Sequence, residues 1–199
     1  MKLDMKHAIK VSLILAAMAA VPALALAGLN LLTQPVIDAN EVAKQEKALK
    51  SVFLGYENPI VSMNEKKEVQ QGMVEAYWPV DPEGDGSLNG RAYLVSGRNG
   101  YGDVSLMIGL RNDQGSFPLC GLNILSNTET YGPVLEEEYL SKIQAWIGKA
   151  ASGEASQDQV TAFVHDGVVC GATYGAKLCR DMIDGAVAHY ASTAEGGQE

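Results

Sequence analysis

The chain has 199 residues, a formal net charge of −9 and 47% hydrophobic residues. This length fits one modest domain with an appendage, and the hydrophobic content excludes a wholly disordered chain. The 24 acidic residues against 15 basic ones disfavour binding to nucleic acid. Three cysteines without a Cys-x-x-Cys spacing give no support to a disulfide scaffold, a zinc finger or a c-type haem. Because the three histidines are scattered, we expect no metal site.

An uncharged apolar run covers residues 11–32 and predicts a single transmembrane helix. About 20 mostly apolar residues are enough to cross a bilayer. Lys2, Lys6 and Lys10 precede the run, and basic residues on this flank favour a cytoplasmic N-terminus. We therefore expect residues 1–36 to form the cytoplasmic N-terminus and the membrane anchor, with everything later outside the cytoplasm.

A cleaved signal peptide is the alternative for this segment. Ala25-Leu26-Ala27 before Gly28 resembles a small-residue cleavage site. The apolar run continues beyond that site through Leu29, Leu31 and Leu32, which favours a retained anchor. Both interpretations deliver the following residues to the same side of the membrane.

The rest of the chain predicts an α+β domain. Residues 38–54 have an amphipathic helical pattern, so we expect a helical stalk over 37–58, ended by Asn58-Pro59. Four short strands, separated by turns rich in Gly, Asp and Asn, are expected at 72–78, 91–96, 104–110 and 121–125. Helices are expected at 136–151 and 173–190, whereas 160–164 fits either a strand or the end of a short helix.

Strands that come first and helices that come later favour a mixed or antiparallel sheet with flanking helices. We expect this domain to cover residues 59–191, with a flexible tail at 192–199. No arrangement of side chains in the sequence predicts a catalytic group. His165 beside Asp166 lacks a nucleophile elbow, and the glycine-rich stretch at 97–102 matches neither a dinucleotide nor a phosphate loop.

Cys170-Gly171-Ala172-Thr173 lies where the last helix is expected to begin. Small residues followed by a hydroxyl allow a ligand close to the backbone, and the first amides of a helix favour negative charge. The segment therefore predicts an anion site with Thr173 at its edge. The alternative is that Thr173 only caps the helix.

Residues 127–134 form a second notable segment, a polar turn after a strand that could also be an ordinary loop. Here the sequence resembles the FMN-binding RnfG subunit of the Rnf electron-transport complex, and it is similar to the related FMN-binding subunit of the sodium-translocating NADH:quinone reductase. The resemblance rests on the Gly-Ala-Thr motif ending at Thr173, on Glu129-Thr130-Tyr131-Gly132 and on Gly100-Tyr101-Gly102-Asp103. The stretches 31–36 and 146–149 add to it. Cys170 stands where the family has Ser or Thr, and Tyr131 where it has Pro.

The resemblance implies that FMN is attached to Thr173 through a phosphoester bond. It places Cys170, Gly171 and Ala172 beside the attachment point. The turn residues Glu129, Thr130, Tyr131 and Gly132 would lie against the flavin. Attachment would require a flavin transferase, and the other partners would be membrane subunits of an Rnf-type complex.

By the same resemblance, the chain would be an electron carrier in the inner membrane, with its flavin domain on the periplasmic side. The complex would couple electron transfer between ferredoxin and NAD to Na+ or H+ transport, so the chain would be part of a translocase without substrate turnover of its own. A membrane-anchored flavin-binding or sensory module, and a stand-alone flavinylated carrier for another reductase, remain alternatives. In an oxidising compartment two of the cysteines could pair; the alternative is three buried thiols.

Overall fold

The computed structural model describes residues 5–167, 169 and 171–195. The chain divides into two compact units, Met1–Lys44 and Gln45–Glu199. The first unit is helical. The second holds the end of that helix and an α+β domain, in agreement with the predicted fold class.

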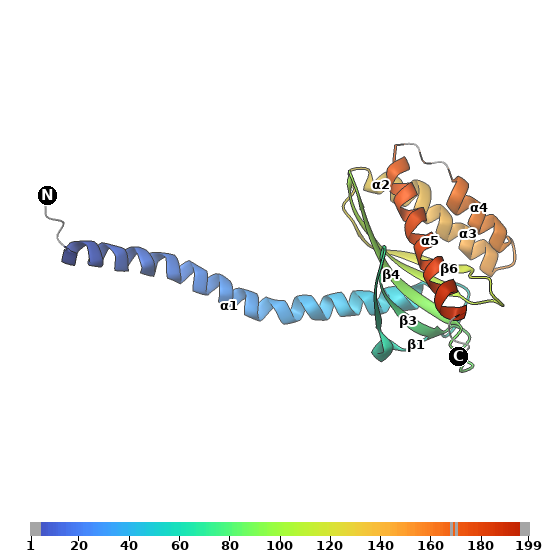
Figure 1. Cartoon of the computed structure of the whole chain (residues 1–199), viewed down its shortest axis with the longest axis horizontal. Coiled ribbons are helices and arrows are strands. Elements are labelled where there is room, and N and C mark those ends of the chain that lie inside the picture. Colours follow the sequence, from blue (N-terminus) through green and yellow to red (C-terminus); the bar gives the residue numbers. More distant parts are fainter. Residues whose placement is uncertain (1–4, 168, 170, 196–199) are drawn as a thin grey trace. The chain divides into compact units, whose positions relative to one another are not determined.

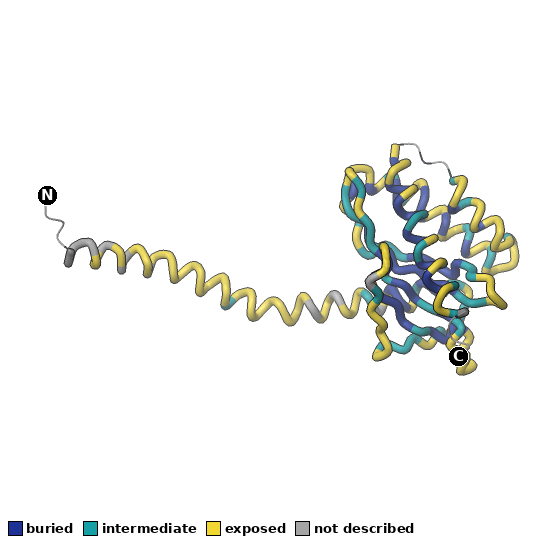
Figure 2. The backbone as a smooth tube through the Cα atoms, viewed as in Figure 1, coloured by how far each residue is buried: buried dark blue, intermediate teal, exposed yellow. Residues whose placement is uncertain are grey.

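Helix α1 (Met5–Ser51) is continuous through the predicted anchor and most of the predicted stalk, and it contains Pro22 and Pro35. Its segment Met18–Ser51 is long and apolar enough to cross a membrane. Large apolar side chains such as Leu24 and Leu31 are more than two-thirds exposed. Figure 2 colours most of this helix as exposed. A soluble domain would bury such residues, whereas a helix in lipid need not.

The sheet has six antiparallel strands in the order β1-β3-β4-β5-β6, and β2 also pairs with β3. The strands are β1 (Ile60–Val61), β2 (Lys67–Gln71), β3 (Val74–Asp81), β4 (Gly90–Asn99), β5 (Gly102–Arg111) and β6 (Leu119–Asn127). A short 3₁₀ turn, η1 (Met63–Glu65), separates β1 from β2. The four predicted strands are thus confirmed as β3 to β6, each longer than expected. β1 and β2 were not predicted.

The remaining helices follow the sheet in the sequence (Figure 1). They are α2 (Gly132–Leu135), the π-helical turn η2 (Glu136–Leu140), α3 (Ser141–Ala151), α4 (Gln157–Asp166) and α5 (Thr173–Glu195). Residues 160–164 are helical, because Ser156 and Gln159 form a capping box that starts α4 before them. Helix α5 begins at the predicted residue and continues beyond residue 190 to Glu195.

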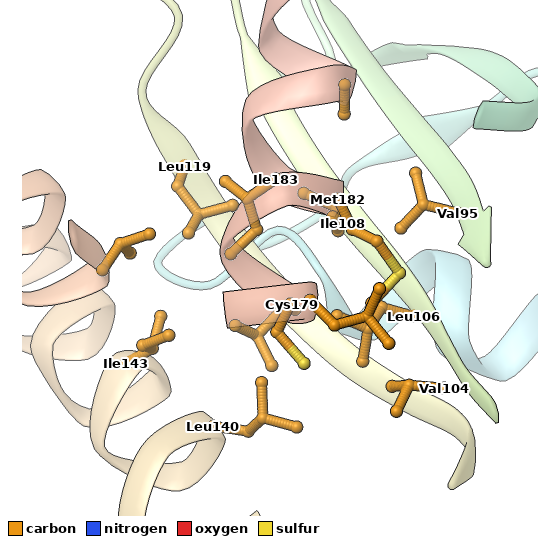
Figure 3. Packing of buried hydrophobic residues seen from close by; sticks show 14 of the residues in the cluster. Val95, Val104, Leu106, Ile108, Leu119, Leu140, Ile143, Cys179, Met182 and Ile183 are labelled. Carbon is orange, nitrogen blue, oxygen red and sulfur yellow. The ribbon is translucent and has the colours of Figure 1, made fainter. Parts of the chain in front are cut away.

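The larger core cluster lies between the sheet and the helices. Figure 3 shows Cys179, Met182 and Ile183 of α5 among strand residues such as Leu106 and Ile108. Leu140 and Ile143, from η2 and α3, complete this part of the core. The packing fixes α5 on the sheet and therefore fixes the position of its first turn.

A second, smaller core cluster includes Leu49 and Val52, at the end of α1, with Trp78 and Met107 of the sheet. Gly109 and Gly121 face each other across β5 and β6. A Cβ atom at these glycines would lie 2.1 and 2.5 Å from the carbonyl oxygen of Val52. The glycine pair therefore makes room for the chain as it leaves α1.

Candidate functional site

A pocket of about 300 Å³ lies between the β4–β5 turn, the turn after β6 and the start of α5. It brings together five predicted site residues from two segments: Glu129, Tyr131, Gly171, Ala172 and Thr173. Three further residues that were not predicted as site residues line the same pocket: Tyr101, Tyr174 and Gly175. Tyr101 belongs to a motif that carried the family resemblance, and Tyr174 and Gly175 directly follow Thr173.

Thr173 is the first residue of α5, and its side chain lines the pocket. The first helical hydrogen bond runs from the Ala176 amide to the Ala172 carbonyl, at 3.0 Å. Ala172 is therefore at the N-cap position, which Thr173 does not occupy. The Thr173 hydroxyl donates to the carbonyl of Val169, at 3.1 Å. The alternative that Thr173 caps α5 through its hydroxyl is therefore wrong, and the oxygen of this exposed residue still has acceptor capacity.

Gly171 precedes the start of α5 and has φ of +89°. Residues with a side chain rarely adopt this left-handed backbone conformation, so a glycine is favoured at this position. A Cβ atom at Gly171 would meet nothing within 4 Å, so this position borders open space. Cys170, the remaining predicted residue of this segment, lies outside the described residues.

Glu129 is buried, with 8% of its surface exposed. Its carboxylate oxygen Oε1 accepts a hydrogen bond from the side-chain amide of Asn99. The other oxygen, Oε2, lies only 2.1 Å from where a Cβ atom of Gly175 would be, in the first turn of α5. A carboxylate at the amino end of a helix is favoured by the helix dipole.

Asn127 holds the turn that carries Glu129. Its side-chain oxygen accepts from the Glu129 amide at 3.1 Å, and its NH₂ donates to the Gly132 carbonyl at 3.2 Å and to Glu136 at 2.9 Å. The Thr130 hydroxyl and amide both donate to the Tyr101 carbonyl. Thr130 and Gly132 therefore shape the turn, and neither lines the pocket.

A second hollow, of about 470 Å³, shares Thr173 and Tyr174 with the pocket. Lys177 and Arg180 of α5 line this hollow. Lys177 pairs with Asp181 at 2.6 Å. Thr173 thus has a buried carboxylate on one side and basic side chains on the other.

The two described cysteines are free and buried. Burial raises the pKa of Cys120 to about 11. Burial, and to a lesser degree the charge of Glu129, also raises the pKa of Cys179 above its ordinary value. Both are therefore protonated at neutral pH and unsuited to act as nucleophiles. The described residues contain no group of three or more His, Cys, Asp or Glu that could hold a metal ion.

The chain thus has a helix that is long and apolar enough to cross a membrane, and an α+β domain with a ligand-sized pocket at the start of its last helix. A family model described as the RnfG N-terminal region matches residues 1–52. This match confirms the resemblance to RnfG over residues 1–52 of the chain. The matched residues contain the candidate membrane helix and precede the pocket. No curated protein matches the chain.

Proposed function

We propose that this chain is the covalently flavinylated electron carrier of an Rnf-type complex, with FMN joined to Thr173 through a phosphoester bond. One observation carries the proposal. The exposed Thr173 lines the same pocket as Glu129 and Tyr131, so the two segments that the resemblance assigns to the flavin meet in space.

The residues of the pocket suit such a group. Its volume lies at the lower end of the range for small-molecule sites. Gly171 leaves space beside Thr173, and the amino end of α5 favours a phosphate. Lys177, one helical turn beyond Thr173, lines the second hollow together with Thr173, and its ammonium group is paired with Asp181. A phosphoester at Thr173 would therefore be stabilised mainly by the helix terminus.

A bound flavin supplies one- and two-electron transfer, while the protein positions it and tunes its potential. Thr173 would hold the phosphate, and Glu129 would place a negative charge beside the pocket. None of these residues needs to move a proton, so we assign no catalytic residue. A covalent bond also keeps the cofactor from diffusing away from a periplasmic domain.

The other subunits of the complex would deliver and remove the electrons, and a flavin transferase would attach the FMN. We place the chain in the inner membrane with its N-terminus in the cytoplasm. In this assignment the chain contributes one step to electron transfer between ferredoxin and NAD, which the complex couples to Na+ or H+ transport.

The test is to replace Thr173 in the full chain, co-expressed with a flavin transferase. Thr173→Ala should abolish the fluorescent flavin band on a denaturing gel, and Thr173→Ser should retain part of it. Thr161→Ala is the matched control, because Thr161 is also exposed and its hydroxyl also donates to the carbonyl four residues earlier, at 3.1 Å. A fluorescent band that survives in Thr173→Ala would overturn the assignment.

A further inference from the structure

Three of the eight tyrosines are followed directly by glycine, in Tyr101-Gly102, Tyr131-Gly132 and Tyr174-Gly175. These three tyrosines are 47%, 49% and 65% exposed. The other five are buried or half-buried. The Tyr-Gly pairs therefore distinguish the tyrosines at the surface from those of the core.

The three exposed tyrosines come from separate parts of the chain and meet at the pocket. The ring centroid of Tyr101 is 5.5 Å from that of Tyr174 and 6.3 Å from that of Tyr131. These distances are in the range of favourable aromatic pairs. Tyr101 is thus the central ring of one aromatic cluster.

Gly102 and Gly175 lie against the turn that carries Glu129, whereas Gly132 belongs to that turn and lies against the side chain of Asn127. A Cβ atom at Gly102 would lie 2.7 Å from the Glu129 amide nitrogen, and one at Gly175 would lie 2.1 Å from the Glu129 carboxylate. At Gly132 the nearest atom, Nδ2 of Asn127, would be 3.0 Å away. The absent side chains allow the backbone at Gly102 and Gly175 to approach the turn and allow the turn itself to fold tightly at Gly132. These contacts place the preceding tyrosines beside the pocket.

Three solvent-exposed aromatic rings around one pocket are an unusual arrangement, because the apolar part of a tyrosine ring is usually at least partly buried. Exposed aromatic faces are the means by which proteins bind flat conjugated rings, as in the stacking of nucleic-acid bases. The isoalloxazine of a flavin is such a ring.

We propose that Tyr101, Tyr131 and Tyr174 form the aromatic wall on which the isoalloxazine ring of the flavin packs. This inference rests on the proposed attachment of FMN at Thr173, which precedes Tyr174 in the sequence and lines the same pocket. The phosphoester fixes only one end of the cofactor, so the ring needs a separate surface. The wall supplies that surface, and one of its members, Tyr131, stands in the turn at the position where the family has proline.

The first test is the flavin fluorescence of the full chain labelled at Thr173, compared with single Leu substitutions at Tyr101, Tyr131 and Tyr174. A tyrosine ring in contact with an oxidised flavin quenches its emission, whereas leucine keeps apolar bulk without quenching. Emission per attached flavin should rise in each variant, and most in Tyr101→Leu. Tyr56→Leu is the control, because Tyr56 is half-buried against the other core cluster.

The second test measures binding of free riboflavin to the full-length Thr173→Ala chain, which lacks both the covalent bond and the phosphate. Each Tyr→Leu change should weaken this binding by about two- to tenfold, the value of one aromatic pair. Unchanged emission and unchanged riboflavin affinity in the triple Leu variant would overturn the inference. The intact mass of each labelled chain separates the two proposals. If the chain with Thr173 and all three tyrosines carries no FMN adduct, attachment at Thr173 is contradicted. Riboflavin binding that depends on the tyrosines would still support the aromatic wall in that case.

Discussion

Glu129 is a buried carboxylate at the pocket, and its geometry fits two roles. Its carboxylate accepts a hydrogen bond from Asn99 and its backbone amide donates to the Asn127 side chain, so the residue helps to fix the turn, as side-chain hydrogen bonds in turns often do. Its place in the pocket lining would also put its charge beside the flavin. A substitution that keeps the shape and removes the charge distinguishes the roles.

Glu129→Gln should raise the midpoint potential of the attached flavin. A nearby negative charge disfavours the reduced, anionic flavin by Coulomb repulsion, which is strongest where water is excluded. Redox titration of the labelled chain measures the shift, with Glu137→Gln, at an exposed position of η2, as the control. If the Glu129→Gln curve overlays the wild-type curve while labelling is intact, the charge is not sensed by the flavin.

The sequence predicted part of this site because short motifs keep Thr173 and Glu129 recognisable. Asn99 was not predicted, because its role depends on a hydrogen bond to Glu129. Asn99 ends β4, whereas Glu129 lies in the turn after β6, so the two residues are far apart in the sequence. Gly175 was missed for a similar reason: nothing local to α5 shows that a carboxylate from the β6 turn lies against it. Residues whose role depends on tertiary contacts are hard to predict from short sequence motifs.

At the scale of elements, α5 is the part that joins core to site. Its middle turns pack on the sheet, and its first turn carries Thr173 and contacts Glu129. Two glycines of this helix, Gly175 and Gly185, differ sharply in their surroundings. A Cβ atom at Gly185 would meet nothing within 4 Å.

Gly175→Ala should destabilise the domain by about 1–3 kcal/mol, because the added methyl group overpacks against Glu129 and Leu135. Gly185→Ala should instead stabilise it by about 0.5–1 kcal/mol, through the lower entropy cost of alanine in a helix. Thermal or urea unfolding of both variants gives the comparison. Equal effects at the two positions would contradict the close packing of α5 on the Glu129 turn.

His189 of α5 provides a prediction on pH. It is buried, its Nδ1 lies 3.1 Å from the Tyr93 hydroxyl, and Tyr77 and Arg91 also surround it. Burial, with repulsion from Arg91, lowers the pKa of His189 below its ordinary value. The unfolded chain therefore takes up this proton first, and stability is lost as pH falls from about 6.5 towards the folded pKa.

The melting temperature of the wild type should therefore fall more steeply below about pH 6.5 than that of His189→Gln. The difference in slope is the readout, because the substitution also changes stability at every pH. Parallel curves for the two proteins would show that His189 does not change its protonation between the folded and unfolded states.

The sequence predicted the four longer strands and the main helices, because their apolar patterns and flanking turns are regular. It did not predict β1, which has two residues, or β2, which is mostly polar and pairs with β3. It also left 160–164 undecided, since a few apolar residues fit either element; the capping box of α4 settles the choice. Pairing partners and caps, more than apolar spacing, determine such short elements.

At the scale of the whole molecule, the chain combines a candidate membrane helix with a pocket-bearing domain. Lys2, Lys6 and Lys10 precede the apolar run, and the later charges are mixed. Basic residues near one end of a span set its orientation, so the domain should lie outside the cytoplasm.

Protease added to intact spheroplasts should digest the domain. The same treatment of whole cells, with the outer membrane closed, should leave it intact. Digestion only after lysis of the spheroplasts would reverse the orientation and remove the case for a periplasmic flavin.

The phosphoester at Thr173 is tested most directly by the intact mass of the full chain purified from cells that contain a flavin transferase, followed by peptide mapping. We expect a single increase equal to FMN less one water molecule, located on the peptide that contains Thr173 and absent from Thr173→Ala. An unmodified mass in the presence of a working transferase, or an FMN adduct on another residue, would contradict it.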